Sequence, residues 1–368
     1  MSGFPSRSAP ADPGIAIGQA VPLIGTPSSG AFLPVDSVVP RAAYPELAAR
    51  FGASNSYVNS IPIIVSGDRA GIATDGEVII VMVPYSLSNQ AIVSSDAGAS
   101  WGNVTLPFSS SGWRGLMYGA GVFCVARYAS TDGASSGNGT AWTTTTLPSA
   151  ANWNTGAFGG GIFVLLANGG SACARSTNGT TWTSGTLPVA GGWNVVFRDE
   201  ARSRFFAHTV AATFSAAYSS DGTTWTAATA SGVPGICGGF ALPSGRYVAV
   251  GSTSSYATSD DGGASWTART LPVSRAASWR VVQSLDGGCA IAQDGSAKLL
   301  STEDGESWTA SFLPYTTATW SVIAPVRGKP YALLTGRASL NPILRVYPAR
   351  SGSDIVLRGP AGYHVRVR

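Results

Sequence analysis

Lysine is almost absent from this chain, and charge of either sign is sparse. Of the 23 basic residues only Lys298 and Lys329 are lysines, and charged residues make up 11% of the sequence. The net charge of +4 is small and dispersed, whereas a nucleic-acid-binding surface needs a clustered basic stripe. No apolar run approaches the roughly 18 residues that a membrane-spanning helix requires. The sequence therefore predicts no nucleic-acid partner and no membrane insertion.

Cysteines, export signals and helical periodicity are also scarce. The four cysteines lie in separate segments without C-x-x-C spacing, which favours buried free thiols over a disulfide or a metal cluster. The opening residues, MSGFPSRSAPADPG, lack the apolar core of a secretory signal, so no signal peptide is expected. Across the repeat region described next, no apolar helical period is sustained. Strands are therefore expected there instead of helices.

What the chain has in abundance is a signature that ends in tryptophan. Six copies are spaced 40 to 43 residues apart, and a polar turn containing glycine precedes each tryptophan. The other five of the 11 tryptophans follow 11 to 13 residues later. A fixed period of about 40 residues indicates one small unit stacked repeatedly, and a four-stranded blade has this size. The turn residue and the tryptophan of the six copies are Asp96 and Trp101, Asn138 and Trp142, Asn178 and Trp182, Asp221 and Trp225, Asp261 and Trp266, and Asp304 and Trp308.

Each period predicts four strands, A to D, with the signature in the turn between C and D. Seven A–B turns can be counted, although the last unit has no signature turn and needs a fourth strand from elsewhere. We expect Ile61–Val65 to supply it, because propellers usually close with the opposite terminus; Asp354–Arg358 is the alternative. The prediction is an all-β, seven-bladed β-propeller with six repeats, preceded by an extended arm and one short helix, Tyr44–Phe51. Its expected parts are residues 1–56, 57–350 and 351–368, the last ending in a β-hairpin around Gly359–Gly362.

The signature resembles the Asp box, S-x-D-x-G-x-[ST]-W, of sialidase-type and related propellers. The copies at Trp101 and Trp266 match it residue for residue, whereas the other four are one residue shorter and two of them carry Asn instead of Asp. A short Asp or Asn side chain accepts hydrogen bonds from backbone N–H groups two or three residues on, while the glycine supplies a positive φ. The Trp is expected to bury its ring between neighbouring sheets. We expect a structural role for these turns, because isolated carboxylates do not form a metal site; no metal and no cofactor is predicted.

The segment before the repeats resembles bacteriophage tail-collar and tail-fibre proteins. Where such proteins often have Cys-Asp-Gly, this chain has Val35-Asp36-Ser37. The resemblance implies a virion tail protein that is assembled in the host cytoplasm and docks to other tail proteins through Leu33, Tyr44, Leu47 and Phe51. An ordinary capped helix that packs under the propeller is the alternative, and a homo-oligomer is left open. The matching residues are Leu33, Pro34, Asp36, Arg41, Tyr44, Leu47, Phe51 and Gly52.

Carboxylates are unevenly distributed between the two ends of the predicted ring. The A–B turns and box turns share one end, here called the box side; the B–C and D–A connections share the other, here called the loop side. A glycosidase needs two carboxylates at one cleft, but all four glutamates of the ring fall on the box side. For the loop side that leaves Asp68, Asp294 and, less clearly, Asp132. We therefore expect no catalytic residues and no enzyme activity.

Arginines and aromatic residues are expected on the loop side instead. Arginine binds carboxylates and phosphates in a bidentate manner, so this pattern favours a binder of acidic surface polysaccharide or lipopolysaccharide; scattered solvated loop residues are the alternative. The expected function is a structural and host-recognition component of a phage tail, such as a fibre, tip or baseplate-associated adsorption protein. The competing function is a soluble sialidase-like glycoside hydrolase or lyase. The candidate binding residues are Arg69, Tyr85, Arg127, Tyr128, His208, Arg275, Tyr315 and Arg337.

Overall fold

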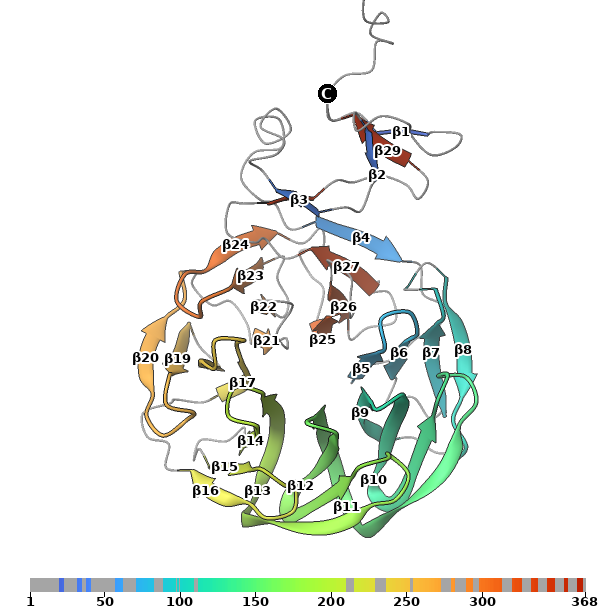
Figure 1. The fold of residues 1–368 in the computed structure, drawn as a ribbon, viewed down its shortest axis with the longest axis vertical. Helices are drawn as coiled ribbons and strands as arrows, with labels where there is room; N and C mark the ends of the chain where they lie inside the picture. The colour runs from blue at the N-terminus through green and yellow to red at the C-terminus, as the bar shows by residue number, and fades with distance from the viewer. Residues whose placement is uncertain are drawn as a thin grey trace, which may run out of the picture. The chain divides into compact units, whose positions relative to one another are not determined.

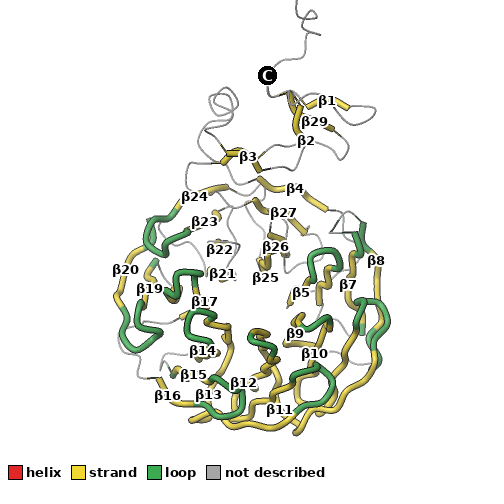
Figure 2. The backbone as a smooth tube through the Cα atoms, in the orientation of Figure 1, coloured by secondary structure: helices red, strands yellow, loops and turns green. Residues whose placement is uncertain are grey.

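A computed structural model of the chain consists of β-strands joined by turns (Figure 2), with no helix among the residues it describes. No part of the chain that the structure describes holds a helix long and apolar enough to cross a membrane. The described residues are 20–22, 32–34, 38–40, 57–61, 71–82, 89–96, 98, 100–108, 112–209, 215–228, 236–251, 254–272, 279–281, 289–293, 298–312, 320–325, 332–336, 343–347, 354–356 and 363–366.

The chain divides into two compact units, and the larger one, Ser56–Ala349, is a ring of antiparallel sheets. Its innermost strands lie next to one another in chain order, and the last lies next to the first, so the ring is closed (Figure 1). These strands correspond to the A strands expected from the sequence. They are β5 (Gly71–Thr74), β9 (Trp113–Gly119), β11 (Thr143–Gly159), β13 (Thr183–Asp199), β17 (Ile236–Ala241), β21 (Trp279–Val281) and β25 (Trp320–Pro325).

The other strands pair outward from these in chain order, as the repeat predicts. Runs of β-branched and aromatic residues form the strands, and Gly-containing turns separate them. The strands are β6 (Ile79–Met82), β7 (Gln90–Ser94), β8 (Gly102–Thr105), β10 (Val122–Ser136), β12 (Ile162–Ser176), β14 (Arg204–Thr209), β15 (Ala216–Ser219), β16 (Thr226–Ala228), β18 (Tyr247–Gly251), β19 (Ser255–Ser259), β20 (Thr267–Thr270), β22 (Cys289–Gln293), β23 (Lys298–Thr302), β24 (Thr309–Phe312), β26 (Ala332–Gly336) and β27 (Ile343–Tyr347).

Four strands are longer than the repeat predicts, because the segments expected to be B–C or D–A loops continue as β-strand. Strands β10 and β12 each supply a B and a C strand, while β11 and β13 each supply the D strand of one blade and the A strand of the next. The pairing of β10 with β11 shifts register near Tyr128 and Ser130, where a B–C loop was expected. As a result, strands β9 to β16 pair one after another and belong to a single eight-stranded sheet.

The N-terminal side of the chain closes the ring, as expected, but with a different segment. Strand β4 (Tyr57–Ile61) pairs with β27, from Tyr57 opposite Tyr347 to Ile61 opposite Ile343. The prediction of Ile61–Val65 was therefore wrong by four residues.

The smaller unit, Met1–Asn55 with Arg350–Arg368, brings the two termini of the chain together. Strand β29 (Tyr363–Arg366) pairs on one edge with β1 (Ala20–Pro22) and on the other with β2 (Phe32–Pro34). Strand β28 (Asp354–Val356) pairs with β3 (Val38–Pro40). The predicted C-terminal hairpin was therefore wrong: both of its strands pair with N-terminal strands. The expected helix at Tyr44–Phe51 lies outside the described residues.

The core of the ring is built on the second tryptophan of each described repeat and not on the box tryptophan. Trp113, Trp153 and Trp193 are 1%, 0% and 0% exposed and pack against buried side chains of neighbouring strands. Of the box tryptophans only Trp225 is buried, at 7% exposed; the others are half-buried. The box tryptophans Trp142, Trp182, Trp266 and Trp308 pack against the core clusters but stay partly exposed. Among the described cysteine side chains, Cys124 and Cys173 are buried free thiols, as predicted.

Candidate functional site

A β-bulge follows the tryptophan in several innermost strands. In β11, Trp153 is opposite Ala167 and Thr155 is opposite Leu166, so Asn154 is the extra residue. In β13, Asn194 holds the same place between Trp193 and Val195. A bulge leaves one residue out of the ladder and re-aims its side chain. The register of β17 and β25 shifts at the same point, one residue after Ile236 and after Trp320.

The bulged asparagines take part in a hydrogen-bonded chain that joins neighbouring blades. Arg114 Nη1 donates to Asn154 Oδ1 at 2.8 Å, and Asn154 Nδ2 donates to Asn194 Oδ1 at 2.6 Å. Asn168 Nδ2 donates to the same Asn194 oxygen at 2.9 Å. All four side chains are half-buried. We call Arg114, Asn154, Asn168 and Asn194, from β9, β11, β12 and β13, the polar ladder.

Tyr128 and an ion pair lie beside the Arg114 end of the ladder. The Arg114 guanidinium carbon is 4.8 Å from the centre of the Tyr128 ring, and 36% of Tyr128 is exposed. Arg127 forms an ion pair with Asp132, the one loop-side carboxylate candidate that falls within the described residues. Arg127 and Asp132 therefore neutralise each other. The geometry suits a polar ligand with negative charge or many oxygen acceptors.

Of the eight residues proposed for binding, Arg127 and Tyr128 lie beside the polar ladder. His208 is only 1% exposed, in β14, which corrects its expected place on a binding surface. Burial lowers the pKa of His208 to about 4, against an opposing hydrogen bond with the Thr209 carbonyl. A Cβ on Gly239 would lie 2.8 Å from His208 Nε2, so the ring fills the space between two strands. Arg69, Tyr85, Arg275, Tyr315 and Arg337 lie outside the described residues.

The sequence alone did not identify the polar ladder, although part of the pattern that marks it can be seen in the repeats. Arg114, Asn154 and Asn194 each follow a second tryptophan directly, at intervals of 40 residues. Their chemistry becomes apparent only when the bulges at Asn154 and Asn194 are known. Asn168 carries no such positional signal.

On the box side, the Asp and Asn side chains are occupied by their own turns. Asn178 Oδ1 accepts hydrogen bonds from Thr180 N and Thr181 N at 3.0 and 2.9 Å. Asp261 Oδ1 accepts from Ala264 N and Ser265 N at 3.0 and 2.9 Å. Burial acts to raise the pKa of Asp261, but hydrogen bonds from Ser265, Ser259 and Ala264 outweigh it and lower that pKa to about 2. These contacts stabilise the turn and leave the carboxylate little capacity for a ligand.

The box glycines have the positive φ that the turns require, and each packs closely on a neighbouring strand. Gly179, with a φ of 72°, would place a Cβ 2.3 Å from Cys124 Sγ. Gly263, with a φ of 93°, would place one 2.5 Å from the Phe206 ring. Glycine is needed at both positions, because a side chain would be strained and would push the strands apart.

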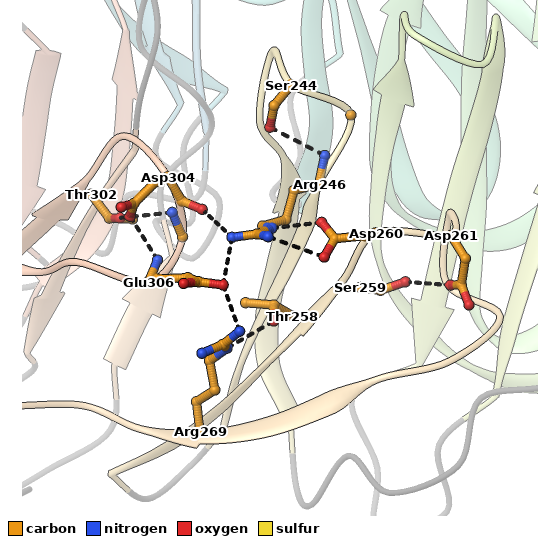
Figure 3. Close-up of polar contacts among 12 residues, drawn as sticks. Ser244, Arg246, Thr258, Ser259, Asp260, Asp261, Arg269, Thr302, Asp304 and Glu306 are labelled. Carbon is orange, nitrogen blue, oxygen red and sulfur yellow. Dashed lines mark hydrogen bonds and ion pairs between the residues drawn. The ribbon is translucent and has the colours of Figure 1, made fainter.

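Arginines on the box side join one blade to the next. In Figure 3, Arg246 lies between Asp260 and Glu306, with Nε 2.6 Å from Asp260 Oδ1 and Nη1 2.8 Å from Glu306 Oε1. Its Nη1 also donates to the Asp304 carbonyl at 2.9 Å, and Arg269 Nη2 donates to Glu306 at 2.6 Å. The planar guanidinium presents five donors in a fixed fork, whereas an ammonium presents three donors from a single nitrogen. This geometry explains why arginine is preferred to lysine here.

Two more arginines, Arg202 and Arg204, make the same kind of link. They donate to the carbonyl oxygens of Asp260 and Gly262, both at 2.6 Å. Asp199, which is 1% exposed, accepts from the Tyr247 hydroxyl at 2.6 Å and from Arg202 Nη1 at 3.1 Å. This carboxylate is therefore sealed inside the ring. Across the described ranges, no group of three or more His, Cys, Asp or Glu side chains could hold a metal ion.

The closed ring of antiparallel sheets defines the chain as an all-β protein of the β-propeller class. Solved structures agree. Virginiamycin B lyase from Staphylococcus aureus aligns with a TM-score of 0.68 at 11% identity, over 79% of this chain and 99% of that one. A streptogramin B lyase aligns at 0.67 and 10% identity, over 79% and 97%. YCF48 bound to D1 peptide aligns at 0.65 and 15% identity, over 89% and 100%.

These similarities show the fold alone, because the identities are so low. The similar structures include lyases and a peptide-bound protein, so the shared fold does not determine the chemistry. No protein-family model matches the chain, and neither does any curated protein sequence.

Proposed function

We propose that this protein is a non-catalytic binding propeller that recognises a surface glycan. The polar ladder carries this proposal, because it gathers one guanidinium and three carboxamides from four strands beside the half-exposed Tyr128. Sugar hydroxyls both donate and accept hydrogen bonds, as carboxamides do. An aromatic ring beside such groups offers an apolar surface to the flat face of a sugar.

The arrangement of carboxylates favours binding over glycoside cleavage. Hydrolysis by the usual route needs two carboxylates placed on either side of the scissile bond. Near the ladder, the described carboxylate is Asp132, and Arg127 is already paired with it. The described box aspartates accept hydrogen bonds from their own turns, and Asp199 is buried. The competing function is a soluble sialidase-like hydrolase or lyase that acts on acidic surface polysaccharide.

The biological setting we propose is a bacteriophage tail, in which the protein is a fibre, tip or baseplate-associated adsorption component. Support comes from the tail-collar resemblance around Leu33, Tyr44, Leu47 and Phe51. In this proposal the protein is assembled into the virion in the host cytoplasm, and residues 1–56 dock to other tail proteins. The propeller then binds host polysaccharide or lipopolysaccharide.

Binding and cleavage can be measured on the same samples. Purified protein is incubated with envelope polysaccharides from candidate hosts, and both retained glycan and new reducing or unsaturated ends are quantified. We expect retention on the protein without new ends. New ends released in proportion to protein concentration would replace the binder with the hydrolase or lyase.

The docking proposal predicts that the two compact units separate in function. Because strands near both termini pair with each other, residues 1–55 and 350–368 should be removed together, which keeps β4 in the ring. We expect this truncated chain to retain glycan binding and to be missing from assembled particles, as measured by quantitative mass spectrometry of virions. Incorporation at the full-length level would place the docking surface on the propeller.

A further inference from the structure

Arg114 determines the hydrogen-bond polarity of the whole ladder. A guanidinium has donors only, so the Asn154 atom that faces it at 2.8 Å must be the amide oxygen. Asn154 therefore presents its NH₂ group to Asn194, whose facing atom must be an oxygen. That oxygen already meets Asn154, so Asn168 must also approach it with an NH₂ group. The side-chain orientations thus follow from chemistry along the entire chain.

The consequence is that the Asn194 side chain itself offers donors only, whereas Asn168 keeps its Oδ1 as an acceptor. Both lone pairs of Asn194 Oδ1 are used, by Asn154 and Asn168. Within the described part of the chain, neither N–H of Asn194 Nδ2 has a partner. Asn154 and Asn168 each keep one further N–H that points to no described acceptor. The opposite end of the ladder is a positively charged guanidinium.

We infer that the polar ladder binds the carboxylate of an acidic sugar, with Asn194 Nδ2 as a direct donor. This inference rests on the proposed glycan-binding function and specifies its ligand class. A carboxylate is acceptor-only, so it complements the donor-only side chain of Asn194. The Arg127–Asp132 ion pair removes the negative charge that would otherwise repel it.

A sugar carboxylate fits these donors better than an extended peptide does. A peptide backbone alternates N–H and C=O groups along its length. Opposite Asn194, a backbone N–H would therefore lose its hydrogen bond to water without gaining an acceptor from that side chain. A hexuronate residue instead carries its two carboxylate oxygens and its ring oxygen on one side. Tyr128, half exposed beside Arg114, is available to the apolar face of a sugar ring.

The test compares two variants that make the same atomic change at different places. Asn194→Asp keeps the oxygen that accepts from Asn154 and Asn168 but replaces the outward NH₂ group with a negatively charged oxygen. Asn178→Asp makes this change in a box turn, where Asp221 and Asp261 already hold the equivalent position in other repeats. The probes are glucuronate and galacturonate, with glucose and galactose as the matched sugars that lack the carboxylate. Binding to the full-length protein is followed by side-chain amide chemical shifts in NMR titrations.

We expect the acidic sugars to bind the wild type and Asn178→Asp equally and to shift the Asn194 side-chain resonances. Asn194→Asp should raise the dissociation constant at least about tenfold, because a charge-assisted hydrogen bond becomes a repulsion. Equal affinity of Asn194→Asp and wild type overturns the inference. So does equal binding of glucose and glucuronate, although the proposed glycan binding then stands. Binding of an acidic peptide but of no sugar overturns the proposed function, and binding of no probe overturns both.

Discussion

The two ends of the ring join neighbouring blades with different chemistry, and the difference separates support from binding. On the box side, Arg246 and Arg202 donate to a carboxylate and to carbonyl oxygens of the next blade, so the groups that meet in these contacts are matched. On the loop side, Asn154 and Asn194 also link blades, but donors remain unused at the Asn194 end. Interactions that are complete stabilise the ring, whereas unused half-buried donors provide capacity for a ligand.

The largest expected difference is in the free energy of unfolding, between replacing a tryptophan of the innermost strands and replacing a box tryptophan. Trp153 is 0% exposed and its Nε1 donates to Ser130 O at 3.1 Å, whereas the box residue Trp182 is half-buried. Trp153→Ala should lower the free energy of unfolding by about 3–5 kcal/mol, because it leaves a large cavity. Trp182→Ala should cost roughly half as much or less, in proportion to the apolar area it buries. Urea denaturation of both variants measures this, and a larger loss for Trp182→Ala would contradict the assignment of the core.

The pH dependence of the free energy of unfolding should reveal the buried side chain of His208 in β14. His208 has a pKa of about 4, below its ordinary value of 6.5, because burial disfavours the charged ring. Above pH 6.5 the ring is neutral in both the folded and the unfolded states. As the pH falls from 6.5 to 4, the unfolded chain takes up a proton that the folded chain resists. The free energy of unfolding should therefore fall by about 3 kcal/mol over this range.

His208→Asn supplies the control for this prediction, since it removes the titrating ring from the same place. The variant should be less stable at pH 7.5 but should lose much less stability between pH 6.5 and 4, as measured by urea midpoints. The pKa values of Asp261 and Asp304 are lowered to about 2, with hydrogen bonds outweighing burial, so their effects begin at more acidic pH in both proteins. An equal decline in wild type and variant would exclude His208 as the source.

The smallest expected effect is at the exposed arginine contacts of the box side. The side chains of Arg246 and Asp260 are 22% and 67% exposed, and exposed ion pairs contribute only about 0.2–1 kcal/mol. A double-mutant cycle of Arg246→Met and Asp260→Asn should give a coupling in this range that weakens in high salt. A coupling above this range that is insensitive to salt would mean that the contact is a buried structural pair.

The sequence predicts the strands that recur with each repeat, but it does not predict pairing between strands that are far apart in the chain. The spacing of the tryptophans predicts the strand order, because each repeat pairs with itself and its neighbours. It predicts an N-terminal closing strand, although the observed strand begins four residues earlier than expected. The pairing of β29 with β1 and β2 joins segments about 330–345 residues apart with no turn between them, so no local signal could reveal it. The predicted C-terminal hairpin was wrong for this reason.

The candidate site could be predicted only in part. Arg127 and Tyr128 were found through their residue types on an expected loop. His208 was assigned to the surface because sequence alone does not show that Gly239 leaves space for a buried ring. Asn154 and Asn194 were missed because a register shift in the strand, and not the residue type, turns them toward each other. The repeated polar residue after tryptophan becomes informative once that bulge is known.

A crystal structure of the full-length protein with a bound hexuronate oligosaccharide would show where the ligand lies. We expect a ligand carboxylate oxygen within about 2.7–3.2 Å of Asn194 Nδ2, with a sugar ring near Tyr128 and the box side free of ligand. A sugar bound instead among Arg246, Asp260 and Glu306, with the polar ladder left empty, would contradict it.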